Sequence, residues 1–400
     1  MAASSPLDAI VLGAGGAGLM CAGVAAQRGR RLVVIDHAAE PGAKIVISGG
    51  GRCNFTNWQA APDRYLSANP HFAKSALGRY TAQDFVDLVD RHRITWHEKT
   101  LGQLFCDGSA RQIVRMLLDE CDAGPGEVTL RLGEAIRDVT HADGRFTVNT
   151  DRARYEAPAL MIATGGPSIP KLGATGFAYD LARRFGLKVV EPRPALVPLT
   201  LPPEQALFRS LSGVAVPVVA RVGAASFAEA ALFTHRGLSG PAILQVSSYW
   251  TRGQAVGIDF LPGRAPGWLR EAKRLSPRTT LRKALADAMP DRLAATLAEQ
   301  LGAADTLAPN TLAGARDATL AEWERRLAHW EFHPNGSEGF AKAEVTVGGI
   351  ATGGLSQRDL SARHLPGLHA IGEAVDVTGW LGGYNFQWAW ASGWAAAQAV

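Results

Sequence analysis

The chain has 400 residues, of which 47% are hydrophobic and 20% charged, and its formal net charge is +4. This composition is typical of a folded globular protein and excludes disordered and collagen-like chains. The basic residues are scattered and acids lie among them, which argues against nucleic acid as a partner. A chain of this length exceeds one ordinary hydrophobic core, so we expect two or three domains.

The cysteines and the N-terminal residues bear on metal binding and location. The four cysteines show neither CxxC spacing nor histidine partners, so we expect no metal site, and their number suits a reducing compartment: Cys21, Cys53, Cys106 and Cys121. The first six residues lack the basic and apolar regions of a signal peptide, and no apolar stretch is long enough to span a bilayer. The sequence therefore predicts a cytoplasmic protein without membrane contact.

The first motif is a strand-like apolar run at 9–12 that enters a glycine-rich turn and then a helical pattern, with the turn reading Gly13-Ala14-Gly15-Gly16-Ala17-Gly18. Gly13 permits the tight turn, Gly15 lets the backbone approach a pyrophosphate, and Gly18 lets the helix pack on the strand. The helix N-terminus then favours phosphate. A second strand at 31–35 ends at Asp36, where a carboxylate can bind a ribose. These features predict a dinucleotide site and leave NAD and FAD open.

A second glycine-rich stretch follows at 40–57 and shows no helix or strand period. Three consecutive glycines after Ser48 cost backbone entropy, which suggests that the backbone wraps a ligand there. Lys44 and Arg52 could neutralise phosphate, and Ser48 and Asn54 could supply hydrogen bonds. The alternative is a flexible surface loop.

The middle of the chain changes character. A hairpin turn is predicted at Asp143-Gly144, and an apolar strand at 159–163 runs into the small-residue turn Thr164-Gly165-Gly166. A helix is predicted from 176 to 185. From about 190, prolines mark a boundary, after which short strands are expected at 196–201, 214–222, 228–233 and 255–260 and helices between 266 and 329.

After residue 343 the chain again contains pairs of adjacent glycines, as it does near its start, and it ends in a predicted helix of small residues. An apolar strand there leads into Gly372, Glu373 and Asp376, and the last helix follows Gly382-Gly383. We therefore expect the two ends of the chain to form one domain, with the middle inserted. The domain bounds are predicted at 1–190 plus 335–400, at 191–265 plus about 325–345, and at 266–325.

Several motifs together resemble the YhiN-type FAD-binding flavoproteins, a group that includes the aminoacetone oxidase family and the BaiN-like NAD(P)/FAD-dependent oxidoreductases. The matching stretches span nearly the whole chain: 42–57, Ala163-Thr164-Gly165-Gly166, 233–241, 345–349, 372–377 and Gly382-Gly383-Tyr384-Asn385-Phe386-Gln387. The resemblance implies an α/β fold, namely a split Rossmann-like FAD domain of the two-dinucleotide-binding type with an inserted antiparallel β-barrel and a small helical subdomain. Asp36 stands where the family more often has Glu.

The resemblance also implies FAD as the cofactor and a set of contacts to it. Asp376 is the expected side-chain partner of the ribityl and pyrophosphate region, and the helix after Gly383 is expected to direct its N-terminus at the flavin ring. The full implied set is Gly13, Ala14, Gly15, Gly16, Ala17, Gly18, Asp36, Lys44, Ser48, Gly49, Gly50, Arg52, Cys53, Asn54, Ala135, Ala163, Thr164, Gly165, Gly372, Glu373, Asp376, Gly383, Tyr384 and Asn385.

The expected activity is FAD-dependent oxidation or reduction of a small molecule, with hydride transfer to flavin N5 and with oxygen or NAD(P) as redox partner. His235 is the candidate catalytic base, although it could equally cap a turn. Cys53 could form an adduct, or pack under the cofactor. The alternative function is binding or modification of RNA, for which the basic residues of 266–329 are the candidates. The sequence leaves the substrate and the oligomeric state open.

Overall fold

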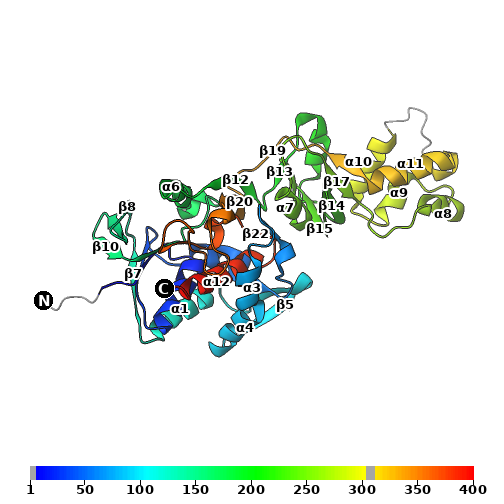
Figure 1. Ribbon diagram of the computed structural model, residues 1–400. Coiled ribbons are helices and arrows are strands. Elements are labelled where there is room, and N and C mark those ends of the chain that lie inside the picture. The colour runs from blue at the N-terminus through cyan, green and yellow to red at the C-terminus, as the bar shows by residue number, and fades with distance from the viewer. Residues whose placement is uncertain (1–5, 303–310) are drawn as a thin grey trace. The chain divides into compact units, whose positions relative to one another are not determined.

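The protein is described by a computed structural model that covers residues 6–302 and 311–400. Its contacts divide the chain into two compact units (Figure 1). Unit 1 comprises Met1–Arg193 and Glu344–Val400, and unit 2 comprises Pro194–Ala343. Unit 1 therefore joins the two ends of the sequence.

The core of unit 1 is a five-stranded parallel sheet in the order β21-β11-β1-β2-β7. The central strands are rich in Val, Ile and Leu and are buried on both faces, as parallel strands between helices must be. The strands are β1 (Ala9–Leu12), β2 (Arg31–Asp36), β7 (Glu127–Leu132), β11 (Ala159–Ile162) and β21 (Leu368–Ala370). This arrangement confirms the predicted Rossmann-like fold.

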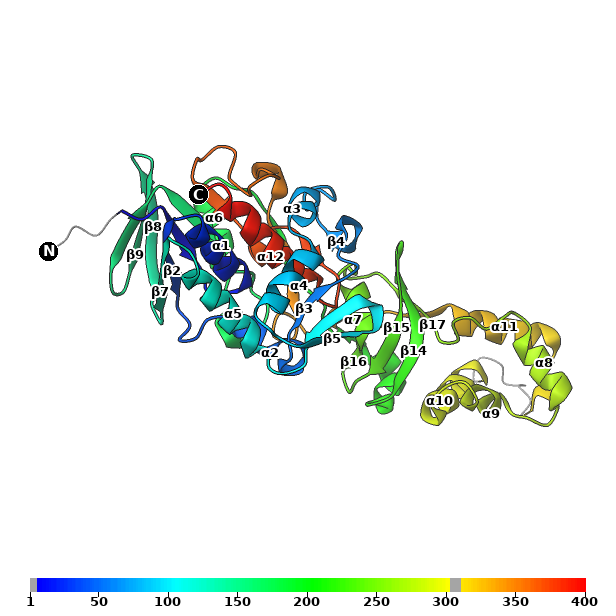
Figure 2. The same ribbon diagram turned by 90° about the horizontal axis from the view of Figure 1, so that it is seen from below.

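Two helices from opposite ends of the chain, α1 (Gly16–Gln27) and α12 (Tyr384–Ala397), lie side by side in Figures 1 and 2. Both are apolar around most of their circumference, which fits helices buried within a core. The other helices of unit 1 are α2 (Ala43–Ile47), α3 (Lys74–Arg79), α4 (Ala82–Arg91), α5 (Arg111–Asp122) and α6 (Phe177–Arg184).

Smaller sheets complete unit 1. Strands β8 (Ile136–Ala142), β9 (Arg145–Thr150) and β10 (Arg154–Ala157) form an antiparallel sheet, and the β8–β9 turn has φ of 50° at Asp143 and 72° at Gly144. Positive φ at both positions is the geometry of the predicted hairpin turn. The remaining strands are β3 (Asn54–Asn57), β5 (Trp96–Lys99) and β6 (Gln103–Cys106) in one sheet, β4 (Tyr65–Leu66) with β22 (Thr378–Gly379), and β12 (Val189–Ala195) with β20 (Val345–Ile350).

Unit 2 contains a seven-stranded antiparallel sheet in the order β18-β17-β14-β15-β16-β13-β19. Val216 and Val218 are buried while Ala215 and Pro217 are exposed, so the alternation seen in the sequence is that of a sheet with one covered face. The strands are β13 (Leu199–Thr200), β14 (Ala215–Val222), β15 (Ala225–Phe233), β16 (Gly237–Ser239), β17 (Val256–Asp259), β18 (Trp330–Phe332) and β19 (Gly336–Ser337).

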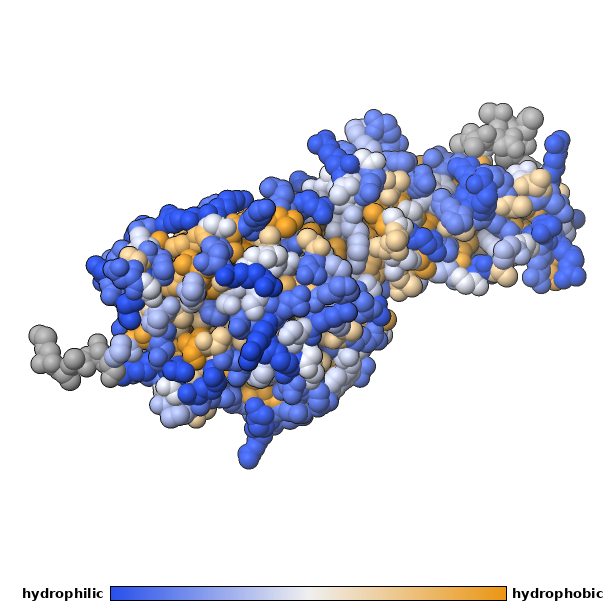
Figure 3. Space-filling model, viewed as in Figure 1, coloured by the Kyte–Doolittle hydropathy of each residue, from blue (hydrophilic) through white to orange (hydrophobic). Residues whose placement is uncertain are grey.

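The strand predicted at 196–201 is shorter than expected, because Leu196 has φ of 47° and bends the chain before β13 begins. The helices of unit 2 are α7 (Pro241–Ser247), α8 (Trp268–Leu275), α9 (Leu281–Ala286), α10 (Asp291–Gly302) and α11 (Asp317–Ala328). No helix within 6–302 and 311–400 combines the length and apolarity needed to cross a bilayer. Polar and charged residues cover most of the face drawn in Figure 3.

A buried histidine gives the fold a testable pH dependence. His369 on β21 is 4% exposed, and its Nδ1 lies 2.9 Å from the carbonyl oxygen of Asp359. Burial lowers the pKa of His369 from its ordinary 6.5, although the Asp359 contact opposes this. The unfolded chain therefore binds a proton that the folded chain excludes, and the free energy of unfolding falls as the pH drops below about 6.5.

We expect His369→Gln to remove this part of the pH dependence. Its size is about 1.4 kcal/mol for each tenfold difference in proton affinity between the folded and unfolded chains. Urea unfolding at pH 5.5 and 7.5 measures it, with His71→Gln, a change at an exposed histidine, as the control. Equal pH dependence in wild type and His369→Gln would show that His369 does not contribute.

Candidate functional site

The glycine turn after β1 has the conformation that the sequence predicts. Gly13 has φ of 108°, and a Cβ there would lie 2.6 Å from the carbonyl oxygen of Ala163. A Cβ on Gly18 would lie 2.0 Å from the carbonyl oxygen of Gly13, so this glycine permits the close contact between α1 and the turn. These two glycines shape the turn itself.

Gly15 differs, because a Cβ there meets no atom within 4 Å. It is the N-cap of α1, and no side chain caps the helix or places an acid in its first turn. The first-turn N–H groups, which include those of Gly16 and Ala17, are thus open to an anion, and the helix dipole favours one. The space next to Gly15 and the uncapped N–H groups of the first turn of α1 therefore fit the pyrophosphate of FAD.

Asp36 organises the same turn. Its Oδ2 accepts a hydrogen bond of 2.7 Å from the Ala14 N–H, and its Oδ1 accepts one of 2.8 Å from the Ala38 N–H. Each carboxylate oxygen can accept a second bond. Asp36 can therefore hold the turn and accept from ribose hydroxyls at once, despite being one methylene shorter than Glu.

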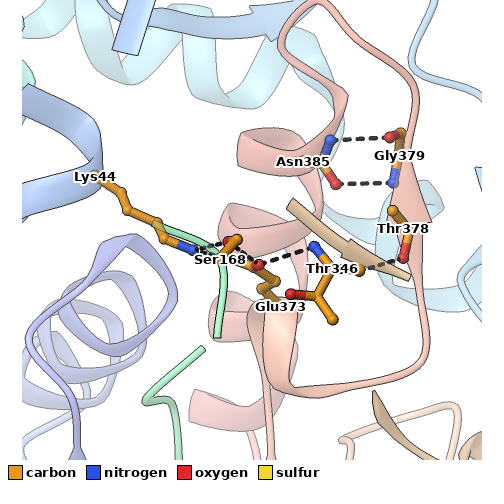
Figure 4. Close-up of polar contacts among 7 residues, drawn as sticks. All are labelled: Lys44, Ser168, Thr346, Glu373, Thr378, Gly379 and Asn385. Carbon is orange, nitrogen blue, oxygen red and sulfur yellow. Dashed lines mark hydrogen bonds and ion pairs between the residues drawn. The ribbon is translucent and has the colours of Figure 1, made fainter. Parts of the chain in front are cut away.

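Lys44 and Glu373, predicted from distant parts of the sequence, meet directly (Figure 4). Lys44 Nζ lies 2.6 Å from Glu373 Oε2 and 2.6 Å from Ser168 Oγ. Ser168 Oγ donates to Glu373 Oε1 at 2.7 Å, and the Thr346 N–H donates to the same oxygen at 3.1 Å. Lys44 therefore neutralises a carboxylate, and its side chain, 31% exposed, can also reach a phosphate.

This cluster continues toward the start of α12 (Figure 4). Thr378 Oγ1 donates to the Thr346 carbonyl oxygen at 2.9 Å. Asn385 then clamps the loop ahead of α12: its Nδ2 donates to the Gly379 carbonyl oxygen at 2.9 Å, and its Oδ1 accepts from the Gly379 N–H at 2.8 Å. The Asn385 side chain is thus engaged with its own loop, which orients the N-terminus of α12.

The loop at 48–54 places its predicted residues in different settings. Gly49 and Gly50 have φ of 56° and 67°, and Ser48 Oγ donates to the Ile45 carbonyl oxygen at 2.8 Å. Arg52 is exposed and forms no ion pair within the described residues. The Asn54 amide pairs with the side chain of Gln103. The glycines are therefore needed for the backbone path, and Arg52 is the open cation.

Cys53 is fully buried, and burial raises the pKa of its thiol far above the ordinary value. A protonated, inaccessible thiol is a poor nucleophile. The structure therefore favours packing over adduct formation for Cys53, which also has a strained φ of 48°.

Buried hydroxyls without partners surround the turn after β11. Within 6–302 and 311–400, Thr164 Oγ1, Thr346 Oγ1 and the Tyr179 hydroxyl are buried and form no hydrogen bond of ordinary geometry. A Cβ on Gly166 would lie 2.7 Å from Thr346 Oγ1 and 2.8 Å from the Tyr179 hydroxyl. Burial and the nearby Glu373 and Asp376 charges raise the pKa of Tyr179. Unpaired buried hydroxyls are costly, and a bound polar ligand would pair them.

Two predicted residues have their polar groups engaged within the protein. The N–H of Ala135 donates to Asp151 Oδ1 at 2.9 Å, and its carbonyl oxygen accepts from the Asp151 N–H at 3.0 Å. Asp376 is 3% exposed and accepts from the Ala68 N–H at 2.9 Å. Burial raises the pKa of Asp376, and the Ala68 bond opposes this. Of the two C-terminal acids, Glu373 is the better placed partner for a ligand.

Gly372 and Gly383 are required by close contacts. A Cβ on Gly372 would lie 2.8 Å from the Ala17 Cβ, and one on Gly383 would lie 2.4 Å from the Thr56 carbonyl oxygen. The carbonyl oxygen of Tyr384 accepts from the Tyr65 hydroxyl at 2.9 Å. Gly383 is the N-cap of α12, and no side chain caps this helix.

An exposed apolar rim, Trp58 and Leu101, borders the start of α12. Trp58 is 38% and Leu101 51% exposed, and Leu101 has a strained φ of 63°. Asn57 Nδ2 donates to the carbonyl oxygens of Leu101 and Gly382, at 3.1 and 2.8 Å. A strained backbone, such as that of Leu101, is often found at functional sites.

His235 lies in unit 2, at the exposed tip of the β15–β16 turn. Thr234 holds this turn, because its Oγ1 accepts from the N–H groups of Arg236 and Gly237 at 3.3 and 3.1 Å. Thr234 therefore caps this turn, and the side chain of its neighbour His235 is exposed.

Sequence reasoning missed Ser168, Thr346, Thr378 and Tyr179. Thr346 lies within the matching stretch 345–349 and Ser168 lies two residues after Gly166, but isolated hydroxyls carry no spacing signal. Within the described residues, no group of three or more His, Cys, Asp or Glu side chains could hold a metal.

The contrast between Gly15 and Gly18 yields a prediction. Gly15→Ala has open space and an extended backbone, so we expect unchanged thermal stability of the apoprotein but at least about tenfold weaker FAD binding, since the methyl blocks the pyrophosphate. Gly18→Ala clashes with backbone and should destabilise the fold instead. Apoprotein melting temperature and the FAD:protein ratio after gel filtration separate the two effects. Full FAD retention by Gly15→Ala would contradict the proposed cradle.

Comparison with known proteins agrees with this geometry. A family model described as "HI0933-like protein Rossmann domain" matches residues 7–399. The chain is 50% identical over 394 residues to the ribosomal RNA dihydrouridine synthase of Escherichia coli (strain K12), covering 98% of this chain and 97% of that protein.

More distant matches extend the same fold. The chain is 27% identical to the 3-dehydro-bile acid delta(4,6)-reductase of Clostridium scindens, with 98% of each chain covered. It also resembles a solved 3-ketosteroid-delta4-(5alpha)-dehydrogenase from Rhodococcus jostii RHA1, with a TM-score of 0.50, 12% identity, and 98% and 97% of the two chains covered. At that identity the likeness concerns the fold alone.

These matches support the broad family resemblance seen in the sequence rather than an aminoacetone oxidase in particular. The open phosphate site at α1, the second glycine signature at Gly372 and the family match all fit FAD. The chain belongs to the HI0933-like Rossmann family and is an FAD-dependent oxidoreductase.

Proposed function

We propose that this protein reduces the C5=C6 double bond of uridine in ribosomal RNA, with FAD as its cofactor. The observation that carries the proposal is the 50% identity, over nearly the full length of both chains, to a protein named as a ribosomal RNA dihydrouridine synthase. The uncapped N-terminus of α1 and the nearby Lys44 suit the cofactor that this chemistry needs. An RNA substrate also agrees with the predicted cytoplasmic location.

The names of the dihydrouridine synthase and the bile acid reductase indicate the same type of reaction, the reduction of a carbon–carbon double bond. A uracil ring and a 3-oxo steroid alkene each contain a carbon–carbon double bond conjugated to a carbonyl group. Reduction adds a hydride to the carbon β to the carbonyl and a proton to the α carbon. We therefore expect a site that delivers a hydride, stabilises negative charge on the carbonyl oxygen and donates a proton. A small-molecule enone is the second candidate substrate, favoured by the bile acid relative.

The chain's own groups suit these tasks. FAD, once reduced by a two-electron donor such as NAD(P)H, supplies the hydride. Trp58 is 38% exposed and follows Asn57, which donates to the carbonyl oxygen of Gly382 just before α12. An unstacked nucleobase can stack on an exposed aromatic ring. The partly buried Lys44–Ser168–Glu373 cluster and the Asn385 clamp connect the surrounding loops, which limits reorganisation during the reaction.

Two expectations from the sequence change with this proposal. The argument against nucleic acid as a partner is weakened by the ribosomal RNA relative. Of the two redox partners that the sequence left open, NAD(P)H is favoured over oxygen, because one relative is named for dihydrouridine, a product of reduction, and the other is named a reductase.

The direct test uses the FAD-loaded protein, NADPH or NADH, and ribosomal RNA from Escherichia coli cells that lack the relative. We expect dihydrouridine in nuclease digests of the RNA, detected by mass spectrometry as uridine plus two hydrogen atoms. RNA from cells that retain the relative is the control. Absence of dihydrouridine, together with reduction of a 3-oxo-4,6-diene steroid, would favour the second candidate.

His235 provides a second test. We propose it as the proton donor to the α carbon, so His235→Gln should slow RNA reduction by about 100-fold or more, the usual contribution of a general acid. FAD content should not change. His329→Gln, at another exposed histidine of unit 2, is the matched control. Equal single-turnover rates for wild type and His235→Gln would remove His235 from the site.

A further inference from the structure

A short segment of unit 2 concentrates positive charge that the FAD site does not use. Between 270 and 283 the chain carries six basic residues and one acid, Glu271; the basic residues are Arg270, Lys273, Arg274, Arg278, Arg282 and Lys283. The segment runs from α8 to α9 through the loop 276–280. In Figure 3, hydrophilic residues gather over the part of unit 2 that carries α8.

Some of these cations already have partners. Lys273 Nζ lies 3.0 Å from Asp317 Oδ1 and 2.9 Å from the Ala315 carbonyl oxygen, and an Arg282 nitrogen lies 2.6 Å from Asp291 Oδ2. These residues hold the helices of unit 2 together. They are not available for a ligand without breaking those contacts.

Arg278 and Lys283 are different. Arg278 is exposed and forms no ion pair or side-chain hydrogen bond within 6–302 and 311–400. Lys283 is exposed, and the nearest carboxylate oxygen to its Nζ is Asp287 Oδ1 at 3.9 Å. Exposed pairs at that distance contribute little, so Lys283 can exchange this partner for a stronger one.

These two cations line a hollow of about 610 Å³ together with Ser276, Pro277, Thr279 and Thr280. Thr280 is used by the fold, since its Oγ1 accepts from the Lys283 N–H at 3.2 Å. The hydroxyls of Ser276 and Thr279 make no side-chain hydrogen bond among the described residues. Within the described residues, the hollow thus combines the unpaired Arg278, the weakly paired Lys283 and the hydroxyls of Ser276 and Thr279.

The loop that carries these groups is fixed in position. The Leu312 N–H donates to the Thr279 carbonyl oxygen at 2.8 Å, and the Ala313 N–H donates to the Pro277 carbonyl oxygen at 2.9 Å. A third bond, of 2.9 Å, runs from the Thr279 N–H to the Ser276 carbonyl oxygen. A preformed surface loses less entropy on binding than a mobile loop does.

We propose that this hollow binds the sugar–phosphate backbone of the RNA substrate. Arginine, lysine and hydroxyl side chains are the usual partners of phosphate oxygens. The hollow, of about 610 Å³, is larger than a single phosphate group. The inference rests on the proposed RNA substrate, and it assigns to unit 2 the binding of RNA rather than the chemistry.

Phosphate contacts of this kind supply affinity and register without sequence information, and they make binding dependent on salt. Loss of the hollow should therefore raise the KM for RNA while leaving kcat at saturating RNA, and the rate of flavin reduction, unchanged. Each lost phosphate contact should also lower the slope of log affinity against log salt concentration by about 1.

The test compares full-length, FAD-loaded wild type with Arg278→Ala/Lys283→Ala. Binding to Escherichia coli ribosomal RNA is measured by filter retention over a series of KCl concentrations. We expect at least about tenfold weaker binding and a salt slope lower by 1 to 2 for the double variant. Arg137→Ala/Arg152→Ala, which removes two exposed arginines of unit 1, is the charge-matched control and should bind as wild type does.

The outcomes separate this inference from the proposed function. If the double variant melts as wild type does and binds RNA within twofold of the control, with the same salt slope, the docking surface is wrong even where wild type forms dihydrouridine. If wild type binds RNA through these residues but forms no dihydrouridine, the docking surface stands and the proposed reaction fails. Failure of wild type to bind RNA at all would overturn the inference.

Discussion

The close packing of α1 against α12 is the constraint on which the rest of unit 1 depends. A Cβ on Gly16 would lie 2.8 Å from the Trp390 ring, and one on Gly393 would lie 2.5 Å from the Ala17 carbonyl oxygen. Small residues on both helices thus let the backbones approach. Trp390 Nε1 also donates to the Phe55 carbonyl oxygen at 2.8 Å. The first and last parts of the sequence are joined by contacts that larger side chains would prevent.

That packing places the N-termini of two helices without side-chain caps in one unit. α1 begins after Gly15 and α12 after Gly383, and neither has a side-chain cap. Between them runs the continuous series of contacts from Lys44 through Ser168, Glu373, Thr346 and Thr378 to the Asn385 clamp (Figure 4). An extended dinucleotide has negative charge at its phosphates and develops more at the flavin during reduction, which matches donors at both ends.

Much of this arrangement could be predicted from the sequence because glycine spacing and apolar runs report directly on backbone geometry. The spacing of Gly13, Gly15 and Gly18 after an apolar run predicted a strand–turn–helix unit, and Asp143-Gly144 predicted a hairpin turn. Contacts that depend on tertiary folding gave no such signal. Lys44 and Glu373 pair although they lie in distant parts of the sequence. Asp376 follows Glu373 by three residues, yet its carboxylate accepts a hydrogen bond from the Ala68 N–H instead.

The same limit applies to the substrate. In the sequence, acidic residues lie among the basic residues of 266–329, but within the described part of the structure only some of these basic residues form ion pairs. Asp317 and Asp291 hold Lys273 and Arg282, whereas Arg278 is left open. Composition alone could not separate structural ion pairs from free charge, and so the argument against nucleic acid was weaker than the sequence indicated.

The central claim is that both ends of the chain enclose one FAD molecule, and a crystal structure of the FAD-bound protein tests it most directly. We expect the pyrophosphate within hydrogen-bond distance of the α1 first-turn N–H groups and the flavin ring at the N-terminus of α12. Density for FAD that contacts only one of these two helix termini, or that lies outside unit 1, would contradict the account.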